Sequence, residues 1–149
     1  MSEFEQPGSA RQLSTAQRRT RLMSGLAAVC LLLVSATLRP DPRNYGTHEQ
    51  LGLPPCTFAA WFHMRCPSCG MTTSWAYATH GDLARAVRVH TTGTLLAGLA
   101  GIGGLLLLAE AAAGRALATW RGTIWGPAAT AGLGIAVLLE WVVRLSVGL

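Results

Sequence analysis

Three of the four cysteines in this 149-residue chain lie close together in the sequence, at positions 56, 66 and 69. Residues 66–69 read Cys-Pro-Ser-Cys, a spacing that brings two thiols together. No helix breaker occurs in residues 71–80, so a helix is predicted to begin near Cys69. A cysteine at a helix N-terminus has its thiolate favoured by unpaired N–H groups and by the helix dipole. This is the arrangement that thiol-exchange sites use.

The spacing alone is not specific, because zinc sites and plain disulfides share it. Three hypotheses stay open: a structural or redox-responsive disulfide among Cys56, Cys66 and Cys69, thiol exchange by the last two, or a zinc ion bound by all three thiolates. His63 lies close enough in sequence to supply a fourth zinc ligand. His80 does not, because a continuous helix would place it about 16 Å from Cys69. The absence of a βαβ pattern excludes a thioredoxin-like domain.

Polar residues lie at both ends of the predicted helix. Thr72 and Thr73 are expected to bond to the backbone in its first turn, or to offer hydroxyls to a polar ligand. His80 is expected to satisfy carbonyl groups at its end, where a glycine suits the left-handed conformation. Asp82 is a predicted N-cap for a short helix over residues 83–89, with Leu83, Ala86 and Val87 on its apolar face.

The composition points to a membrane protein. Half of the residues are apolar and only 13% are charged, which is low for a soluble domain. All 12 basic residues are arginines, scattered at span ends rather than gathered on one face, which argues against nucleic-acid binding. Residues 1–20 are polar without hydrophobic periodicity and are predicted to be a disordered tail. Residues 21–149 are predicted to form a single membrane domain.

Three apolar segments have the length to cross a bilayer, at about residues 22–38, 91–113 and 123–145. The first could also be a secretory signal cleaved near residues 34–36, although we favour its retention. Residues 39–90 carry the cysteines, and prolines and glycines predict an extended, solvated loop at the start of this segment, over residues 39–55. The predicted fold is all-α and integral to the membrane, with three transmembrane helices and short interfacial helices between the first and second.

Small residues recur every fourth position on the two later spans, where they would let helix backbones approach closely. They are Gly93, Ala97 and Gly101 on one span and Ala128, Gly132 and Ala136 on the other. We expect the two stripes to pack on each other. A second copy of the chain or another membrane protein would use the same faces, and lipid is the expected partner elsewhere.

Several polar residues within the spans have structural interpretations. Glu110 and Glu140 lie near span ends and are expected to anchor at the interface rather than act within the bilayer. Glu140 and Arg144 have the spacing of a helical ion pair. Cys30 is expected to be a small buried apolar residue, and His90 is expected to be solvated.

Counting all arginines gives six on each side of the membrane, so the orientation is predicted from the first span, which usually dominates. Four arginines precede the first span and two follow it, which places the N-terminus in the cytoplasm and the cysteine segment outside. The residues are Arg11, Arg18, Arg19 and Arg21 before the span and Arg39 and Arg43 after it. Disulfides persist on the outer side of a plasma membrane.

An ordered set of motifs resembles domain-of-unknown-function family 2752, a family of small bacterial integral membrane proteins. The motifs are Pro55-Cys56-Thr57-Phe58, Cys66-Pro67-Ser68-Cys69-Gly70-Met71-Thr72 and His80-Gly81-Asp82-Leu83, followed by an apolar hairpin. The resemblance covers roughly residues 40–145 and implies a bacterial inner (plasma) membrane location, but no activity. The family pattern reads Cys-Pro-Gly-Cys-Gly-Leu-Thr-Arg. Ser68 therefore replaces a glycine, and Thr73 replaces an arginine that would place a positive charge beside Cys69.

The favoured function is a non-catalytic membrane component with a structural or redox-responsive disulfide. A membrane thiol–disulfide oxidoreductase is the enzymatic alternative. Such enzymes relay electrons through a second cysteine pair, and Cys56 with the mid-span Cys30 would make a poor one. A structural zinc-binding membrane module is the third hypothesis.

Overall fold

The computed structural model describes residues 12–116 and 127–147. Within these ranges the chain forms six α-helices and one 3-10 helix, and its only β-structure is an isolated bridge between Gln12 and Arg115. Three of the helices have the length and apolar composition to cross a membrane. They are α1 (Thr15–Thr37), α5 (Thr91–Ala113) and α7 (Pro127–Val147). The predicted all-α fold with three membrane-spanning helices is confirmed, and its apolar faces indicate contact with lipid.

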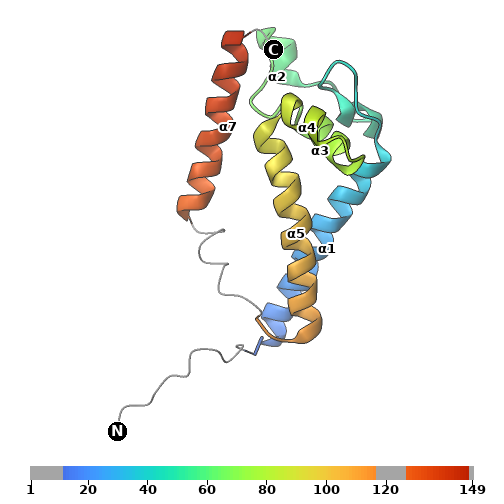
Figure 1. The fold of residues 1–149 in the computed structure, drawn as a ribbon, viewed down its shortest axis with the longest axis vertical. Helices are drawn as coiled ribbons and strands as arrows, with labels where there is room; N and C mark the ends of the chain where they lie inside the picture. The colour runs from blue at the N-terminus through green and yellow to red at the C-terminus, as the bar shows by residue number, and fades with distance from the viewer. Residues whose placement is uncertain (1–11, 117–126, 148–149) are drawn as a thin grey trace.

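The short helices gather at one end of the long ones, where α1 finishes and α5 begins (Figure 1). They are η1 (Thr47–Leu51), α2 (Thr57–Phe62), α3 (Met71–Thr79) and α4 (Leu83–Val89). This end carries Cys56, Cys66 and Cys69. The C-terminal end of α5 lies at the opposite end (Figure 1). Residues 117–126, which include the predicted start of the third span, lie outside the described residues.

The first long helix begins at Thr15, earlier than the predicted start of its span. Ser14 explains this start, because its hydroxyl accepts a hydrogen bond from Gln17 N while the Gln17 side chain accepts one from Ser14 N. This reciprocal capping box satisfies two backbone groups that a helix otherwise leaves unpaired. The last part of the predicted tail is therefore helical, and residues 1–11 lie outside the described residues.

Helices α1 and α5 run side by side and pack closely (Figure 1). Gly25 and Gly104 lie at the closest approach, where a Cβ on Gly25 would meet Gly104 O at 2.9 Å. A buried ion pair, Arg21 to Glu110 at 2.9 Å, joins the two helices near the opposite end from the cysteines. Glu110 is therefore buried against α1, which supplies its countercharge, and its predicted place at the interface stays a prediction.

The small-residue stripes of α5 and α7 do not pack on each other. A Cβ on Gly93 would meet Ser74 of α3, and one on Gly101 would meet Leu32 of α1. On α7, nothing lies within 4 Å of a Cβ on Gly132, and no residue of the apolar window is buried. The predicted stripe packing is wrong because α1 and α3 already occupy the small face of α5.

Helix α7 contacts the rest of the chain through its C-terminal end. Glu140 accepts hydrogen bonds from Thr91 N at 2.6 Å and Thr92 N at 2.8 Å, so its carboxylate caps the start of α5. Arg144 donates to Cys69 O at 3.1 Å. The predicted Glu140 to Arg144 ion pair is therefore replaced by two contacts with other elements.

His90 is fully buried, so the expectation that it is solvated is wrong. It is the N-cap of α5: its Nδ1 accepts from Gly93 N at 3.1 Å, and its Nε2 lies 3.1 Å from Pro67 O. The ring thus connects the start of α5 to the cysteine segment. A histidine between a short surface helix and a membrane span has no sequence feature that reveals this burial.

Two other burial expectations are also wrong. Cys30 is exposed on the outer side of α1, since α5 covers a different face of that helix. In α4 the buried residues are Ala86 and Val89, whereas Leu83 is 60% exposed. The small Ala86 lets α4 lie close to α3, which turns the larger side chain outward.

Candidate thiol site

The cysteine motif forms a tight turn immediately before α3. Cys69 N donates to Cys66 O at 3.0 Å, and Ser74 N donates to Gly70 O at 2.8 Å. Gly70 is the N-cap of α3, with φ 95°, and a Cβ there would meet Asn44 O at 2.9 Å. Only glycine fits both this left-handed conformation and this space. The helix therefore begins at Met71, close to the predicted start, and holds both thiols ahead of its first turn.

Three sulfur atoms gather at this turn. The Sγ atoms of Cys56, Cys66 and Cys69 all lie within 4.8 Å of one another. The Cys66 and Cys69 sulfurs lie 3.0 Å apart, and all three residues are free thiols. Cys56 is the N-cap of α2, so the third thiol comes from a separate element. The predicted gathering of the three cysteines is confirmed, and a disulfide among them is not formed.

The two thiols of the motif are not equivalent. Burial raises the pKa of the Cys66 thiol, but hydrogen bonds from the neighbouring thiols and from Ser68 outweigh this effect and lower the pKa below its ordinary value. For Cys69, which is only 8% exposed, burial and the hydrogen bond to Cys66 raise the pKa to about 12. Cys66 is therefore the residue that forms a thiolate first, and once it is ionised the Cys69 thiol donates a hydrogen bond to it.

The thiols face a cleft of about 680 Å³. Its walls come from three parts of the chain: the loop and η1 before Cys56, helix α2, and the cysteine turn with the start of α3. The lining residues that carry polar or reactive groups include Arg43, His48, Glu49, Ser68, Thr72 and Thr73. The cleft gives a small molecule or a peptide segment access to Cys66.

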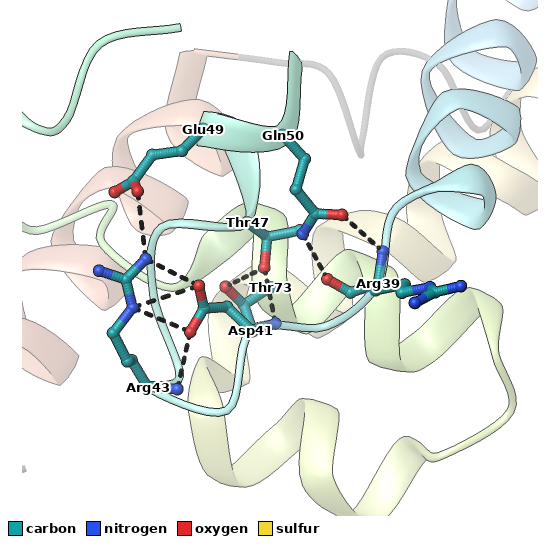
Figure 2. Close-up of polar contacts among 7 residues, drawn as sticks. All are labelled: Arg39, Asp41, Arg43, Thr47, Glu49, Gln50 and Thr73. Carbon is teal, nitrogen blue, oxygen red and sulfur yellow. Dashed lines mark hydrogen bonds and ion pairs between the residues drawn. The ribbon is translucent and has the colours of Figure 1, made fainter. Parts of the chain in front are cut away.

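A polar network holds η1 and the loop before it against α3 (Figure 2). It corrects part of the predicted solvated loop over residues 39–55. Thr47 is fully buried, accepts from Asp41 N at 3.1 Å, and meets Thr73 Oγ1 at 2.8 Å. Gly46 and Gly52 flank η1 in left-handed conformations, which lets the loop fold back onto α3. The central part of this segment thus packs on the protein rather than forming an extended loop, whereas residues 51–55 are exposed as predicted.

Charged residues complete this network. Arg43 donates to both oxygens of Asp41, the shortest contact being 2.8 Å, and to Glu49 at 3.1 Å (Figure 2). These hydrogen bonds hold the pKa of Asp41 below its usual value. The guanidinium groups of Arg43 and Arg65 lie over the Tyr45 ring at 5.2 and 4.9 Å, so the ring links the loop to the residue before Cys66.

Side chains from outside the motif bind the backbone of the cysteine turn. Trp141 Nε1 donates to Arg65 O at 2.6 Å, and Arg144 donates to Cys69 O. The His90 ring binds Pro67 O between these two positions. Sequence reasoning missed all three contacts. Trp141 and Arg144 resemble ordinary interfacial anchors at the end of a span, and no local pattern connects them to a turn more than 70 residues earlier.

The remaining predicted site residues separate into two groups. Thr72 and Thr73 line the cleft with the cysteines. His80 and Asp82 lie at the far end of α3 with capping roles: His80 Nδ1 lies 2.7 Å from Ala76 O, and Asp82 accepts from Arg85 N at 3.0 Å. His63 ends α2 with φ 51°, is exposed, and does not belong to the thiol group.

Residues 56–104 match the model of a family described as protein of unknown function (DUF2752). This is the family suspected from the sequence, and the match covers a shorter stretch than the predicted residues 40–145. The match begins at Cys56, includes the whole cysteine turn with α3 and α4, and ends at Gly104 in α5, where α1 packs. Neither a curated protein nor a solved structure matches the chain. Thr73 binds Thr47, and the guanidinium at the cysteine turn belongs to Arg144.

Proposed function

We propose that this protein is a membrane component whose Cys66 and Cys69 thiols convert reversibly into a disulfide. The main support is the 3.0 Å separation of the two sulfur atoms across a tight turn. A disulfide bond measures about 2.05 Å, so a movement of about 1 Å would close it. The unequal pKa values and the cleft beside Cys66 favour a responsive dithiol over a permanent structural disulfide.

The proposed reaction is exchange with an external disulfide. The Cys66 thiolate attacks one sulfur of that disulfide, forming a mixed disulfide and releasing the other sulfur as a thiolate. Cys69 then loses its proton and attacks the Cys66 sulfur, forming the Cys66 to Cys69 bond and releasing the second external thiolate. Two electrons pass to the external disulfide, which leaves as two thiols after taking up two protons.

Redox titration of the purified protein tests this proposal. The protein is equilibrated in mixtures of reduced and oxidised glutathione, free thiols are blocked with an alkylating reagent, and mass spectrometry counts the blocked positions. We expect Cys66 and Cys69 to lose reactivity together as the mixture becomes oxidising, while Cys30 stays alkylated. Cys66→Ser and Cys69→Ser should each abolish the transition.

Cys56→Ser provides the matched comparison, because it removes a thiol from the same cluster without touching the motif. It should leave a single transition with both motif thiols still paired. Three thiols that stay free across the whole titration would contradict the proposal. So would a disulfide that always includes Cys56. Sustained turnover of an external disulfide with a second reductant would indicate the oxidoreductase alternative.

The third thiol supports a second candidate, a zinc site. Tetrahedral zinc with bonds near 2.3 Å places its sulfur ligands about 3.8 Å apart, and the three Sγ atoms lie within 4.8 Å of one another. Cys56, Cys66 and Cys69 would hold the ion, which would fix the turn and α2 together. Among the described residues no fourth histidine, cysteine or carboxylate joins the group, so the fourth position would face the cleft. Metal analysis of the protein purified without chelator decides between the two candidates. One zinc per chain, released when all three cysteines are alkylated, would favour the zinc site.

We also propose that the cysteine end faces outward from the bacterial inner membrane and that α1 is retained. The arginines before the first span support this orientation, and the packing of Gly25 against α5 supports retention. Labelling of intact cells with a membrane-impermeant maleimide, after treatment with a membrane-impermeant reductant, should modify Cys66. Labelling only after cell lysis would place the site in the cytoplasm.

A further inference from the structure

The cysteine turn is held at both ends by one helix from the far end of the sequence. Trp141 of α7 donates to the carbonyl of Arg65, the residue immediately before Cys66, at 2.6 Å. Arg144, almost one helical turn later, donates to the carbonyl of Cys69 at 3.1 Å. The two donors are three residues apart and therefore lie on one face of α7. This single face spans the turn from the residue before the motif to the motif's last residue.

Outside its C-terminal end, α7 has little support from the rest of the described chain. The apolar window of α7 has no buried residue. The Trp141 ring meets Phe58 of α2 edge-on at 6.2 Å, and Glu140 caps α5. The C-terminal end of α7 is therefore positioned by α2, by α5 and by the cysteine turn together, as Figure 1 shows at the end of α7 near α2.

We propose that Trp141 and Arg144 are positioning residues for the dithiol: they fix the carbonyls at the two ends of the motif and so keep the Cys66 and Cys69 sulfurs within closing distance. This inference rests on the proposed disulfide exchange at the same turn. The disulfide forms readily only when the two sulfurs spend much of their time close together, because closing the ring costs more conformational entropy when the turn is loose. Removing either donor allows one end of the turn to move.

Thermodynamic linkage gives the proposal a second consequence. If docking of α7 favours the disulfide form, disulfide formation favours docking of α7 by the same factor. Oxidation of Cys66 and Cys69 would then strengthen the docking of the C-terminal end of α7 on the cysteine turn. The dithiol would act as a redox sensor whose output is the position of α7.

The test is the glutathione equilibrium of the full-length protein in detergent, measured by alkylation and mass spectrometry. Trp141→Phe keeps the aromatic contact with Phe58 and removes only the N–H donor. Arg144→Gln removes the charged donor, and Arg144→Lys keeps a donor and the charge. We expect the equilibrium constant for disulfide formation to fall about fivefold in Trp141→Phe and in Arg144→Gln, as for the loss of one hydrogen bond. Arg144→Lys should recover most of the wild-type value.

Arg88→Gln is the matched control, because Arg88 is exposed on α4 at the same end of the molecule. It should leave the equilibrium unchanged. If Arg144→Gln shifts the equilibrium constant and Trp141→Phe does not, the guanidinium acts through its charge on the thiols, and the positioning role is overturned. Wild-type values in both donor variants also overturn it, while leaving the proposed function intact. A wild-type protein that never forms the disulfide overturns both proposals.

Discussion

Thr47 and Thr73 meet through their hydroxyl oxygens at 2.8 Å, and both side chains are fully buried. The pair fastens η1 to α3 and thereby joins the two walls of the cleft that contains the thiols. Thr47 also accepts a hydrogen bond from Asp41 N, so one hydroxyl organises the loop and the helix together.

Replacing these threonines with valine should show energetic coupling. Thr47→Val keeps the shape but leaves Asp41 N–H and the Thr73 hydroxyl without a partner, so the free energy of unfolding should fall by about 2 kcal/mol. Thr73→Val should cost about 1 kcal/mol, and the double variant should cost less than the sum of the two. Denaturant unfolding in mixed micelles measures all three variants. Thr37→Val, at an exposed position, is the control, and strictly additive losses would contradict a direct contact.

The close approach of α1 and α5 predicts an asymmetry between two glycines. A Cβ on Gly25 would lie 2.8 Å from Leu108 Cγ and 2.9 Å from the backbone oxygen of Gly104, which cannot move aside. Gly25→Ala should therefore lower the free energy of unfolding by about 2 kcal/mol, as overpacking does. Gly98→Ala places its Cβ in open space and should be neutral or slightly stabilising. Equal stabilities for the two variants would show that the helices do not meet at Gly25.

Local patterns predicted much of this molecule. Hydropathy identified three spans because each contains enough consecutive apolar residues to cross a bilayer. Asp82 and the glycine before it predicted the start of α4, since capping is decided within a few residues. The gathering of the thiols followed from their spacing, with only Cys56 brought in from another element.

Contacts between distant residues were not predictable in the same way. The stripe of small residues on α5 is visible in the sequence, but the sequence does not indicate that α1 rather than α7 packs against it. His90 and Glu140 look like solvated or interfacial groups, yet they meet at the start of α5 because α7 returns to that end of the molecule. The burial of Thr47 was not predictable for another reason. A threonine among glycines and prolines is typical of a solvated loop, and here the two left-handed glycines that flank η1 turn it toward the interior.

The pKa values predict different pH profiles for the two motif thiols. Only the thiolate reacts with iodoacetamide, so the reaction rate of each cysteine rises as pH passes through its pKa. Cys66, whose pKa is lowered, should reach its half-maximal rate at a lower pH than an unstructured cysteine peptide. Cys69, with a pKa raised to about 12, should stay slow up to strongly alkaline pH. Mass spectrometry with fragmentation distinguishes the two positions.

The hydrogen bond between these thiols gives that experiment its control. Cys69→Ala removes the donor to Cys66, so the half-maximal rate of Cys66 should move to higher pH. Cys30→Ala, in the middle of α1, should leave the profile unchanged. Indistinguishable profiles for Cys66 and Cys69 would show that the inequality of the two thiols is absent in solution.

The buried ion pair between Arg21 and Glu110 predicts a large loss when one partner is removed. Both side chains are shielded from solvent, with exposed fractions of 9% and 0%. Glu110→Gln leaves the guanidinium buried without this countercharge and should lower the free energy of unfolding by about 3 kcal/mol or more. Replacing both residues with apolar ones, Arg21→Met with Glu110→Leu, should recover most of the loss, since neither charge then needs a partner. Arg85→Gln disrupts an exposed pair with Asp82 and should cost less than about 1 kcal/mol.

Because the Arg21 to Glu110 pair joins α1 to α5, this pattern of stability losses requires that α1 stays attached in the mature protein. Wild-type stability in Glu110→Gln, with an intact mass lacking residues 1–36, would mean that α1 is instead cleaved as a signal.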